Sequence, residues 1–247
     1  MKIGIFSDVH ANLEALTIVM EAYKHLDIDD FICLGDVVGY GASPDECCNI
    51  VRPLVKFSVL GNHDAAVAGR MEYAYYYEAC RFVLDLHSNA ISKENMDWLK
   101  SIKYTETMDI DGVSIGFSHG APVIPENFDY VFSMEQAYKL LPHFDELKDV
   151  NFIGHSHLCR AFALEKDDVH EVISQDFVIR PGMKYIIGVG STGQPRDYDN
   201  RAAYTVFDTI ERKFTYYRAE YDIEKAALKI FNARIDRNFG NRLFVGV

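Results

Sequence analysis

Short segments containing aspartate, asparagine or histidine recur along the chain, and each directly follows an apolar run. The segments are Ser7-Asp8-Val9-His10, Gly35-Asp36, Gly61-Asn62-His63-Asp64, Ser118-His119-Gly120 and Gly154-His155-Ser156-His157. Five of the nine histidines lie in them. Carboxylate, amide and imidazole groups without a thiolate suit a borderline divalent metal such as Mn, Fe, Zn, Ni or Co. The residue types therefore predict a metal centre.

Seven of these side chains are candidate metal ligands, namely Asp8, His10, Asp36, Asn62, His119, His155 and His157. Seven ligands are too many for one tetrahedral ion and suit two ions that share a bridging carboxylate, roughly 3.5 to 4 Å apart. Two pairs, Asp8 with His10 and His155 with His157, are spaced two residues apart, so in an extended segment each pair points to one side. A single such segment is weak evidence, because a lone histidine at a strand end is usually hydrogen-bonded. The whole set together indicates a two-metal site.

The elements that must position these residues alternate between strand and helix in the first 60 residues. Strands are expected over residues 2–6, 30–34 and 56–60, and helices over residues 12–26 and about 44–51. Asn12 and Ser43 are suited to cap the two helices, and Pro44 suits a first helical position. This alternation predicts parallel strands with right-handed crossovers, whose carboxyl ends are where ligands bind in α/β sheets.

The rest of the chain is predicted to be helical first and then rich in strands. Residues 70–104 show two helical stretches joined near Ser92, and we expect them to form a helical cap. Strands are expected over residues 113–118, 151–153, 160–164, 169–174, 185–189, 203–207 and 214–218, with helices over 133–144 and 222–236. Without an internal repeat or a linker-like tract, residues 1–247 are expected to form a single domain of two packed sheets flanked by helices.

Composition excludes several classes of protein. The 247 residues are 49% hydrophobic and 13% aromatic, which is too apolar for a disordered chain. No apolar run reaches the roughly 20 residues that span a bilayer. The N-terminus meets Asp8 and His10 too early for a signal-peptide core, so a cytoplasmic protein is expected. A net charge of −12 disfavours long nucleic acids as partners, and five cysteines without C-x-x-C spacing suggest reduced thiols.

In their order, the motifs D-x-H, G-D, G-N-H-D, H-G and G-H-S-H resemble those of the calcineurin-like metallophosphoesterase superfamily. Residues 191–203 are similar to a segment of its small bacterial branch, which includes phosphodiesterases and hydrolases of dinucleoside polyphosphates. The resemblance covers the whole chain. It implies an α/β fold, a four-layer αββα sandwich of two mixed sheets, with a dinuclear metal centre.

The resemblance also implies a role for each motif residue. Asp8, His10, Asp36 and His157 hold the first metal, and Asp36, Asn62, His119 and His155 hold the second. His63 is then not a ligand but the acid that protonates the leaving oxygen. Mn is the metal expected first, with Fe, Zn, Ni, Co or Mg as alternatives. A hydroxide bridging the metals would attack phosphorus, and the net positive centre would bind phosphate despite the acidic chain.

Two features concern the substrate rather than the metals. Related phosphatases carry an arginine in the loop after G-D, where this chain has Tyr40. Arg196 is the replacement candidate for a cationic clamp, and a surface salt bridge is the alternative for it. In the cap, apolar and aromatic residues recur at steps of three and four residues, which predicts a packed helix face. The face comprises Tyr73, Tyr76, Tyr77, Cys80, Val83, Leu84 and His87. Tyr75 lies off that face and is open to a nucleobase.

The expected function is therefore hydrolysis of a small phosphorylated substrate. A phosphodiester or a dinucleoside polyphosphate cleaved asymmetrically is placed ahead of a monoester. The alternatives are a phosphomonoesterase or protein phosphatase, a nuclease, and a non-catalytic binding scaffold on the same fold. A membrane or long nucleic acid is not expected as a partner, and the oligomeric state is left open.

Overall fold

The first third of the chain builds the parallel half of one sheet. In the computed structural model, which describes all 247 residues, β1 (Lys2–Phe6), β2 (Asp30–Cys33) and β3 (Phe57–Ser58) pair in parallel. Helices α1 (Leu13–Tyr23) and α2 (Pro44–Leu54) form the crossovers. The Asn12 side chain accepts a hydrogen bond from the amide of Ala15, as the capping prediction requires. The strand-helix alternation is therefore confirmed.

The C-terminal strands complete this first sheet. β11 (Ala202–Asp208), β12 (Lys213–Ala219) and β9 (Asp176–Val178) add in antiparallel fashion, in the order β3-β2-β1-β11-β12-β9. The second sheet has the order β4-β5-β6-β10-β7-β8. Its strands are β4 (Thr105–Ile110), β5 (Val113–Ser118), β6 (Val150–Ile153), β7 (Cys159–Leu164), β8 (Val169–Glu171) and β10 (Lys184–Val189). The predicted α/β sandwich of two mixed sheets is confirmed.

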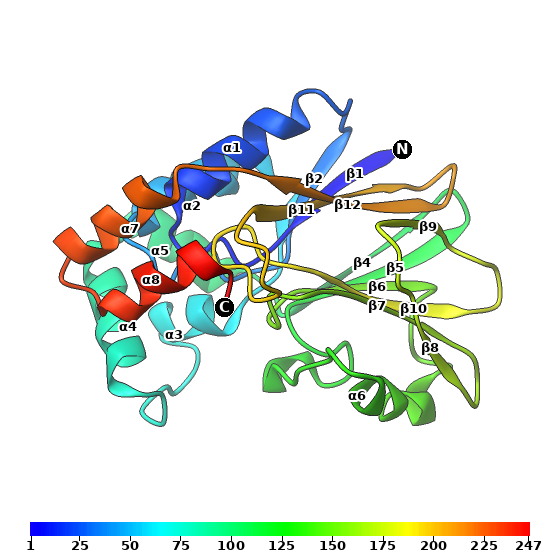
Figure 1. The fold of residues 1–247 in the computed structure, drawn as a ribbon. Coiled ribbons are helices and arrows are strands. Elements are labelled where there is room, and N and C mark those ends of the chain that lie inside the picture. Colours follow the sequence, from blue (N-terminus) through cyan, green and yellow to red (C-terminus); the bar gives the residue numbers. More distant parts are fainter.

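Buried apolar side chains join the two sheets face to face. Ile3, Ile5 and Ile32 of the first sheet lie in one core with Phe117 and Phe152 of the second. The alternate residues of the first sheet face α1 and α2 instead, so β1 is apolar on both faces. Figure 1 shows α1, α2 and α7 (Ile223–Asn232) outside the first sheet and α6 (Met134–Tyr138) outside the second. Helices cover the outer face of each sheet, and this gives the αββα layering.

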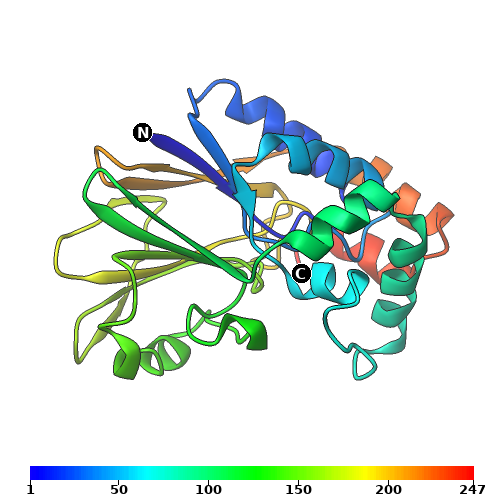
Figure 2. The same ribbon diagram turned by 180° about the vertical axis from the view of Figure 1, so that it is seen from behind.

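Four more helices lie beyond one end of the strands (Figures 1 and 2), and three of them differ from expectation. They are α3 (Asn62–Val67), α4 (Glu78–Ala90), α5 (Lys93–Ser101) and α8 (Arg237–Val245). Helix α3 was not expected. Helix α4 begins only at Glu78, so the prediction that Tyr73, Tyr76 and Tyr77 share its packed face is wrong, although the rest of that face is buried. The C-terminal helix expected over 222–236 ends at Asn232, and the unpredicted α8 follows it.

Strands β4 and β9 (Asp176–Val178) were missed, and one helix end and one strand end were also predicted incorrectly. β4 was missed because its residues TETMDI alternate only between exposed and half-buried positions at a sheet edge. The helix expected over 133–144 stops at Tyr138 and is followed by a 3₁₀ turn, Leu141–His143. Pro142 within that turn cannot donate a helical hydrogen bond, which explains the break. β8 ends at Glu171, three residues before the expected strand end.

The cysteine prediction agrees with the structure, since all five cysteines are free. Cys33, Cys47, Cys48 and Cys80 are buried, and Cys159 is half-buried. Burial raises the pKa of the Cys80 thiol to about 12. None of the helices is both long and apolar enough to cross a membrane.

A buried hydroxyl ties α1 to the first sheet, and its removal is expected to lower stability. The Tyr23 hydroxyl lies 3.0 Å from the carbonyl oxygens of both Ile5 and Thr205, and Tyr23 is 1% exposed. Tyr23→Phe should lower the free energy of unfolding by about 1 to 2 kcal/mol, because it leaves buried acceptors with fewer donors. Thermal denaturation followed by circular dichroism checks this. The control Tyr198→Phe, at an 86% exposed side chain, should leave the melting temperature unchanged, and equal melting temperatures for both variants would contradict the prediction.

Candidate metal centre

Five turns at one edge of the sandwich bring the predicted ligands together. Three come from the first sheet, at the ends of β1 and β2 and at the start of α3 after β3. Two come from the second sheet, at the ends of β5 and β6. Within each sheet these strands are parallel, so their carboxyl ends lie at the same edge. The site therefore lies where the carboxyl ends of both sheets meet.

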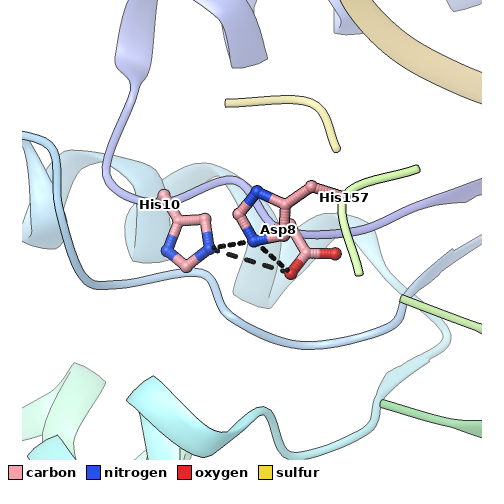
Figure 3. Close-up of side chains that lie close together, drawn as sticks. All are labelled: Asp8, His10 and His157. Atoms are coloured by element: carbon pink, nitrogen blue, oxygen red, sulfur yellow. Dashed lines mark hydrogen bonds and ion pairs between the residues drawn. The ribbon is translucent and has the colours of Figure 1, made fainter. Parts of the chain in front are cut away.

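One group of side chains consists of Asp8, His10 and His157 (Figure 3). The two Nε2 atoms of the histidines are 3.0 Å apart. Asp8 Oδ1 lies 3.2 Å from His157 Nε2 and 3.7 Å from His10 Nε2, and it has no hydrogen-bond partner. All three residues are at most 2% exposed. Three electron-rich atoms of buried side chains therefore converge.

The imidazole rings are oriented by backbone carbonyls behind them. His10 Nδ1 lies 3.0 Å from the oxygen of Val38, and His157 Nδ1 lies 2.6 Å from the oxygen of Gln194. A carbonyl only accepts hydrogen bonds, so in the neutral ring the proton sits on Nδ1 and Nε2 presents a lone pair. Two facing lone pairs beside an unpaired carboxylate oxygen are stabilised by a cation. The donor set fits a metal ion held by these three residues.

The second group consists of Asp36, Asn62, His119 and His155. His119 Nε2 is 3.2 Å from Asp36 Oδ2 and also 3.2 Å from Asn62 Oδ1. His119 Nδ1 is held 2.6 Å from the oxygen of Leu34, so its Nε2 also faces inward. The ligand atoms of Asp36, His119 and His155 all lie within 4.8 Å of one another. This arrangement also offers oxygen and nitrogen donors to a cation.

Asp36 lies between the two groups. Its Oδ2 lies 3.7 Å from His10 Nε2 as well as 3.2 Å from His119 Nε2. Its other oxygen, Oδ1, accepts the backbone amide of His63 at 2.8 Å. A Cβ atom at Gly61 would lie 2.1 Å from Asp36 Oδ1, so glycine is required for α3 to approach this carboxylate. The carboxylate between two ligand groups has the position of a bridge.

The electrostatics of the site favour a charged Asp8 carboxylate, neutral His155 and His157 rings and a protonated His119 ring. Burial lowers the pKa of His155 to about 3 and that of His157 to about 4, which keeps both rings in the neutral form that binds metals. Burial opposes ionisation of Asp8, yet the neighbouring histidines, His157 foremost, hold its pKa below the usual range. At His119 burial is outweighed by the charge of Asp36, which raises the pKa to about 9. The two carboxylates thus favour positive charge where the groups meet.

The backbone at the site is not extended, so the predicted reason for the convergence of Asp8 and His10 is wrong. Positive φ angles occur at Asp8 (52°), His10 (46°), Asp36 (52°), His155 (63°) and His157 (59°). Such conformations are rare for residues other than glycine and concentrate at functional sites. His155 and His157 also do not share one group: His157 lies with Asp8, and His155 lies with His119. Tight turns, and not strand alternation, aim these side chains.

His63 is the first residue after Asn62 in α3 and lies at the same site. It is 3% exposed, and its ring is 4.5 Å from the ring of Tyr40 and 4.9 Å from that of His10. Its Nδ1 is buried without a hydrogen-bond partner, and burial lowers its pKa well below the ordinary value. A ring nitrogen of His63 lies within 4.8 Å of the ligand atoms of His10 and Asp36.

The Asp64 carboxylate binds backbone amides and does not orient the His63 ring. The carboxylate accepts the backbone amide of Val38 at 3.1 Å and that of Gly61 at 3.4 Å. It therefore joins the loop after β2 to the first turn of α3. The Asp64 contacts hold the two loops that carry Asp36 and Asn62 against each other.

A cavity of about 530 Å³ opens onto the metal groups, and both predicted substrate residues line it. Arg196 Nη2 donates to Gln194 Oε1 at 2.9 Å, and its guanidinium carbon is 5.6 Å from the centre of the Tyr40 ring. Its Nε has no partner. Tyr40 is 9% exposed, and its ring packs 4.8 Å from that of Phe239. Arg196 forms no salt bridge, so the ion-pair alternative is not observed.

Two aromatic residues beside the ligands escaped the sequence analysis. The Tyr76 hydroxyl accepts a hydrogen bond from Asn62 Nδ2 at 2.8 Å. The ring of Tyr130 stacks on that of His155, with centroids 4.0 Å apart and an interplanar angle of 14°. Tyr76 was assigned to the packed face of a helix that begins only at Glu78, and no pattern marks Tyr130, which lies in irregular chain. Only the fold places these rings at the site.

Comparison with known proteins agrees with this geometry. Residues 1–212 match the calcineurin-like phosphoesterase superfamily domain. An uncharacterized protein of Methanocaldococcus jannaschii is 36% identical over 99% of this chain and 98% of its own length. The crystal structure of a metallophosphoesterase from Sphaerobacter thermophilus is 34% identical and superposes with a TM-score of 0.83 over 100% of this chain and 99% of that chain.

A more distant structure shares the fold. A hypothetical protein from Pyrococcus horikoshii is only 17% identical, yet it superposes with a TM-score of 0.80 over 100% of this chain and 98% of that chain. Two six-stranded mixed sheets, a buried Asp and His cluster and the sequence match agree with one another. The chain belongs to the calcineurin-like phosphoesterase superfamily, and it is a hydrolase of that family.

Proposed function

We propose that this chain uses two metal ions, Mn first among them, to hydrolyse a small phosphodiester or to cleave a dinucleoside polyphosphate asymmetrically. The observation that carries the proposal is the pair of ligand groups on either side of Asp36, with three imidazole Nε2 atoms turned inward. Asp8, His10, Asp36 and His157 hold the first ion. Asp36, Asn62, His119 and His155 hold the second. Bound ions of this kind acidify a coordinated water and neutralise phosphoryl oxygens.

The residues around the ions bind and protonate the substrate. His63 lines the cavity next to Asp36, and its role is to protonate the leaving oxygen. Arg196 lines the same cavity with an unpaired Nε, and its role is to bind a phosphoryl oxygen. Tyr40 supports the Arg196 guanidinium with its ring face and separates it from the protein interior. The acidic charge of the chain as a whole still disfavours a long nucleic acid as substrate.

Metal analysis and a panel of substrates test this proposal. The purified protein, loaded with Mn, is assayed with bis(p-nitrophenyl) phosphate, p-nitrophenyl phosphate, a cyclic nucleotide and a dinucleoside tetraphosphate. Faster turnover of the diester or the tetraphosphate than of the monoester is the expected result. Preference for the monoester would identify a phosphomonoesterase instead. Two bound ions with no turnover of any substrate would contradict catalysis and favour the scaffold alternative.

The clamp role of Arg196 gives a separate prediction. Arg196→Ala should raise the KM for the preferred substrate about tenfold while the bound metal stays at the wild-type level, because the guanidinium contacts the substrate and no ligand. The matched control Arg180→Ala removes an exposed arginine that does not line the cavity, and its kinetics should equal those of wild type. Unchanged KM and kcat in Arg196→Ala would rule out the clamp.

A further inference from the structure

The cavity above the metal groups is lined by both polar and aromatic side chains. Arg196 and His157 are among the polar ones. Tyr75, Phe128 and Tyr130 contribute aromatic rings to the same cavity from two separate segments, one before α4 and one after β5. A volume of about 530 Å³ exceeds what one phosphoryl group fills and lies within the range typical of small-molecule sites.

Tyr75 is an exposed ring held beside a candidate ligand. Its side chain is 74% exposed, which is unusual for an aromatic residue that lines a cavity. The ring packs edge-on against that of Tyr76, with centroids 4.9 Å apart and an interplanar angle of 82°. Tyr76 in turn accepts the hydrogen bond from Asn62. The position of the Tyr75 ring is thus linked to that of Asn62 through one intermediate residue.

Tyr130 has a comparable position at a second candidate ligand. One face of its ring is stacked on His155, and the side chain is still 44% exposed. The Tyr40 side chain is only 9% exposed, so packing in the core explains its aromatic ring. The Tyr75 and Tyr130 side chains remain much more exposed, so core packing does not explain theirs. Two accessible rings therefore border the metal group of Asn62 and His155. Glu126 and Asn127 add polar side chains to the same cavity.

We propose that the substrate is a nucleoside phosphoester whose base stacks on Tyr75 and Tyr130 while its phosphoryl group lies at the metal groups. This inference rests on the proposed function for the position of the phosphoryl group. Aromatic rings bind bases without strong sequence preference, because every base has a π-face. The polar groups of Glu126 and Asn127 suit the hydrogen-bonding edge of a base better than a purely apolar aryl group.

Equilibrium binding tests the aromatic subsite independently of catalysis. The Mn-loaded protein is titrated with adenosine 5′-monophosphate and with ribose 5-phosphate, which share the sugar phosphate and differ by the base. Wild type should bind the nucleotide about tenfold more tightly, since stacking on one ring contributes about that factor. Tyr75→Ala should remove most of this difference, and Tyr75→Phe should retain it. Equal affinity of wild type for the two ligands would overturn the proposal.

Kinetics with a common leaving group provides the second measurement. Two substrates release the same phenolate: the p-nitrophenyl ester of thymidine 5′-monophosphate and methyl p-nitrophenyl phosphate. A difference in kcat/KM between them therefore reports the effect of the other substituent on phosphorus. For wild type, kcat/KM should be about tenfold higher for the nucleoside ester than for the methyl ester. This ratio should fall in Tyr75→Ala. It should not fall in the control Tyr138→Ala, because Tyr138 is an exposed tyrosine outside the cavity. A ratio of one would refute the subsite while leaving phosphoester hydrolysis intact. Absence of turnover with a preserved nucleotide preference in binding would refute the proposed function and retain the subsite.

Discussion

Asp36→Ala is expected to lose the bound metal and, with it, hydrolysis. The Asp36 carboxylate lies between the two ligand groups, at 3.7 Å from His10 Nε2 and 3.2 Å from His119 Nε2. Its removal leaves the convergent imidazole nitrogens with half of the compensating negative charge. Loss of a residue that merely supports a ligand lowers metal affinity about 10- to 100-fold, so loss of a shared ligand should exceed about 100-fold.

Metal content measured by mass spectrometry after dialysis tests the Asp36 prediction, and turnover is measured on the same samples. Asp36→Asn keeps the side-chain shape and an acceptor for the amide of His63, so it separates the loss of charge from the loss of packing. Asp176→Ala is the matched control, because Asp176 pairs with Lys213 at the surface and its side chain is 50% exposed. Wild-type metal content in both Asp36 variants would show that Asp36 does not bridge two ions.

His63→Ala is expected to keep the metal and lose most of its turnover. A positioned general acid contributes about 10² to 10⁴ in rate, so kcat should fall by about that factor. The loss should be smaller for a p-nitrophenyl ester than for a dinucleoside tetraphosphate, because p-nitrophenolate leaves without protonation. Metal content, kcat with each substrate and circular dichroism together check the prediction.

The same variant decides between two roles that the geometry allows for His63. A ring nitrogen of His63 lies within 4.8 Å of ligand atoms of His10 and Asp36, which is compatible with a ligand as well as with an acid. Metal loss equal to that of Asp36→Ala would identify His63 as a ligand. An equal fall in kcat for activated and unactivated leaving groups, with metal retained, would assign His63 to orientation and not to proton transfer.

Much of the fold was predictable because its strands are buried on both faces. β1, β2, β5 and β6 are short apolar runs, and parallel strands covered on both sides show this pattern regardless of their neighbours. The missed strand β4 lies at a sheet edge, where half-exposed positions accept polar residues and the apolar signal disappears. The missed helix α8 carries few apolar residues, among them the buried Phe239 and Leu243. A strand that is buried on both faces shows a continuous apolar run in the sequence. An element that is buried only along a narrow contact shows no such run.

The sequence by itself determined the donor set of the candidate site. Asp, Asn and His recur after apolar runs, and the order of those runs implies parallel strands with a common edge. The types of ligand, and with them the class of metal, depend only on covalent structure and on which strand each residue follows. The order of the motifs carries the resemblance that implies phosphoester chemistry. These properties can therefore be inferred without coordinates.

The tertiary structure alone decided how the turns aim those donors and which side chains surround them. Positive φ angles in the turns place His155 and His157 in different groups, although the two are separated by a single residue. Tyr130 reaches His155 from irregular chain, and Phe239 reaches Tyr40 from the C-terminal helix. Turn conformations and contacts between distant segments depend on the packing of the whole chain. No local pattern of residues encodes them.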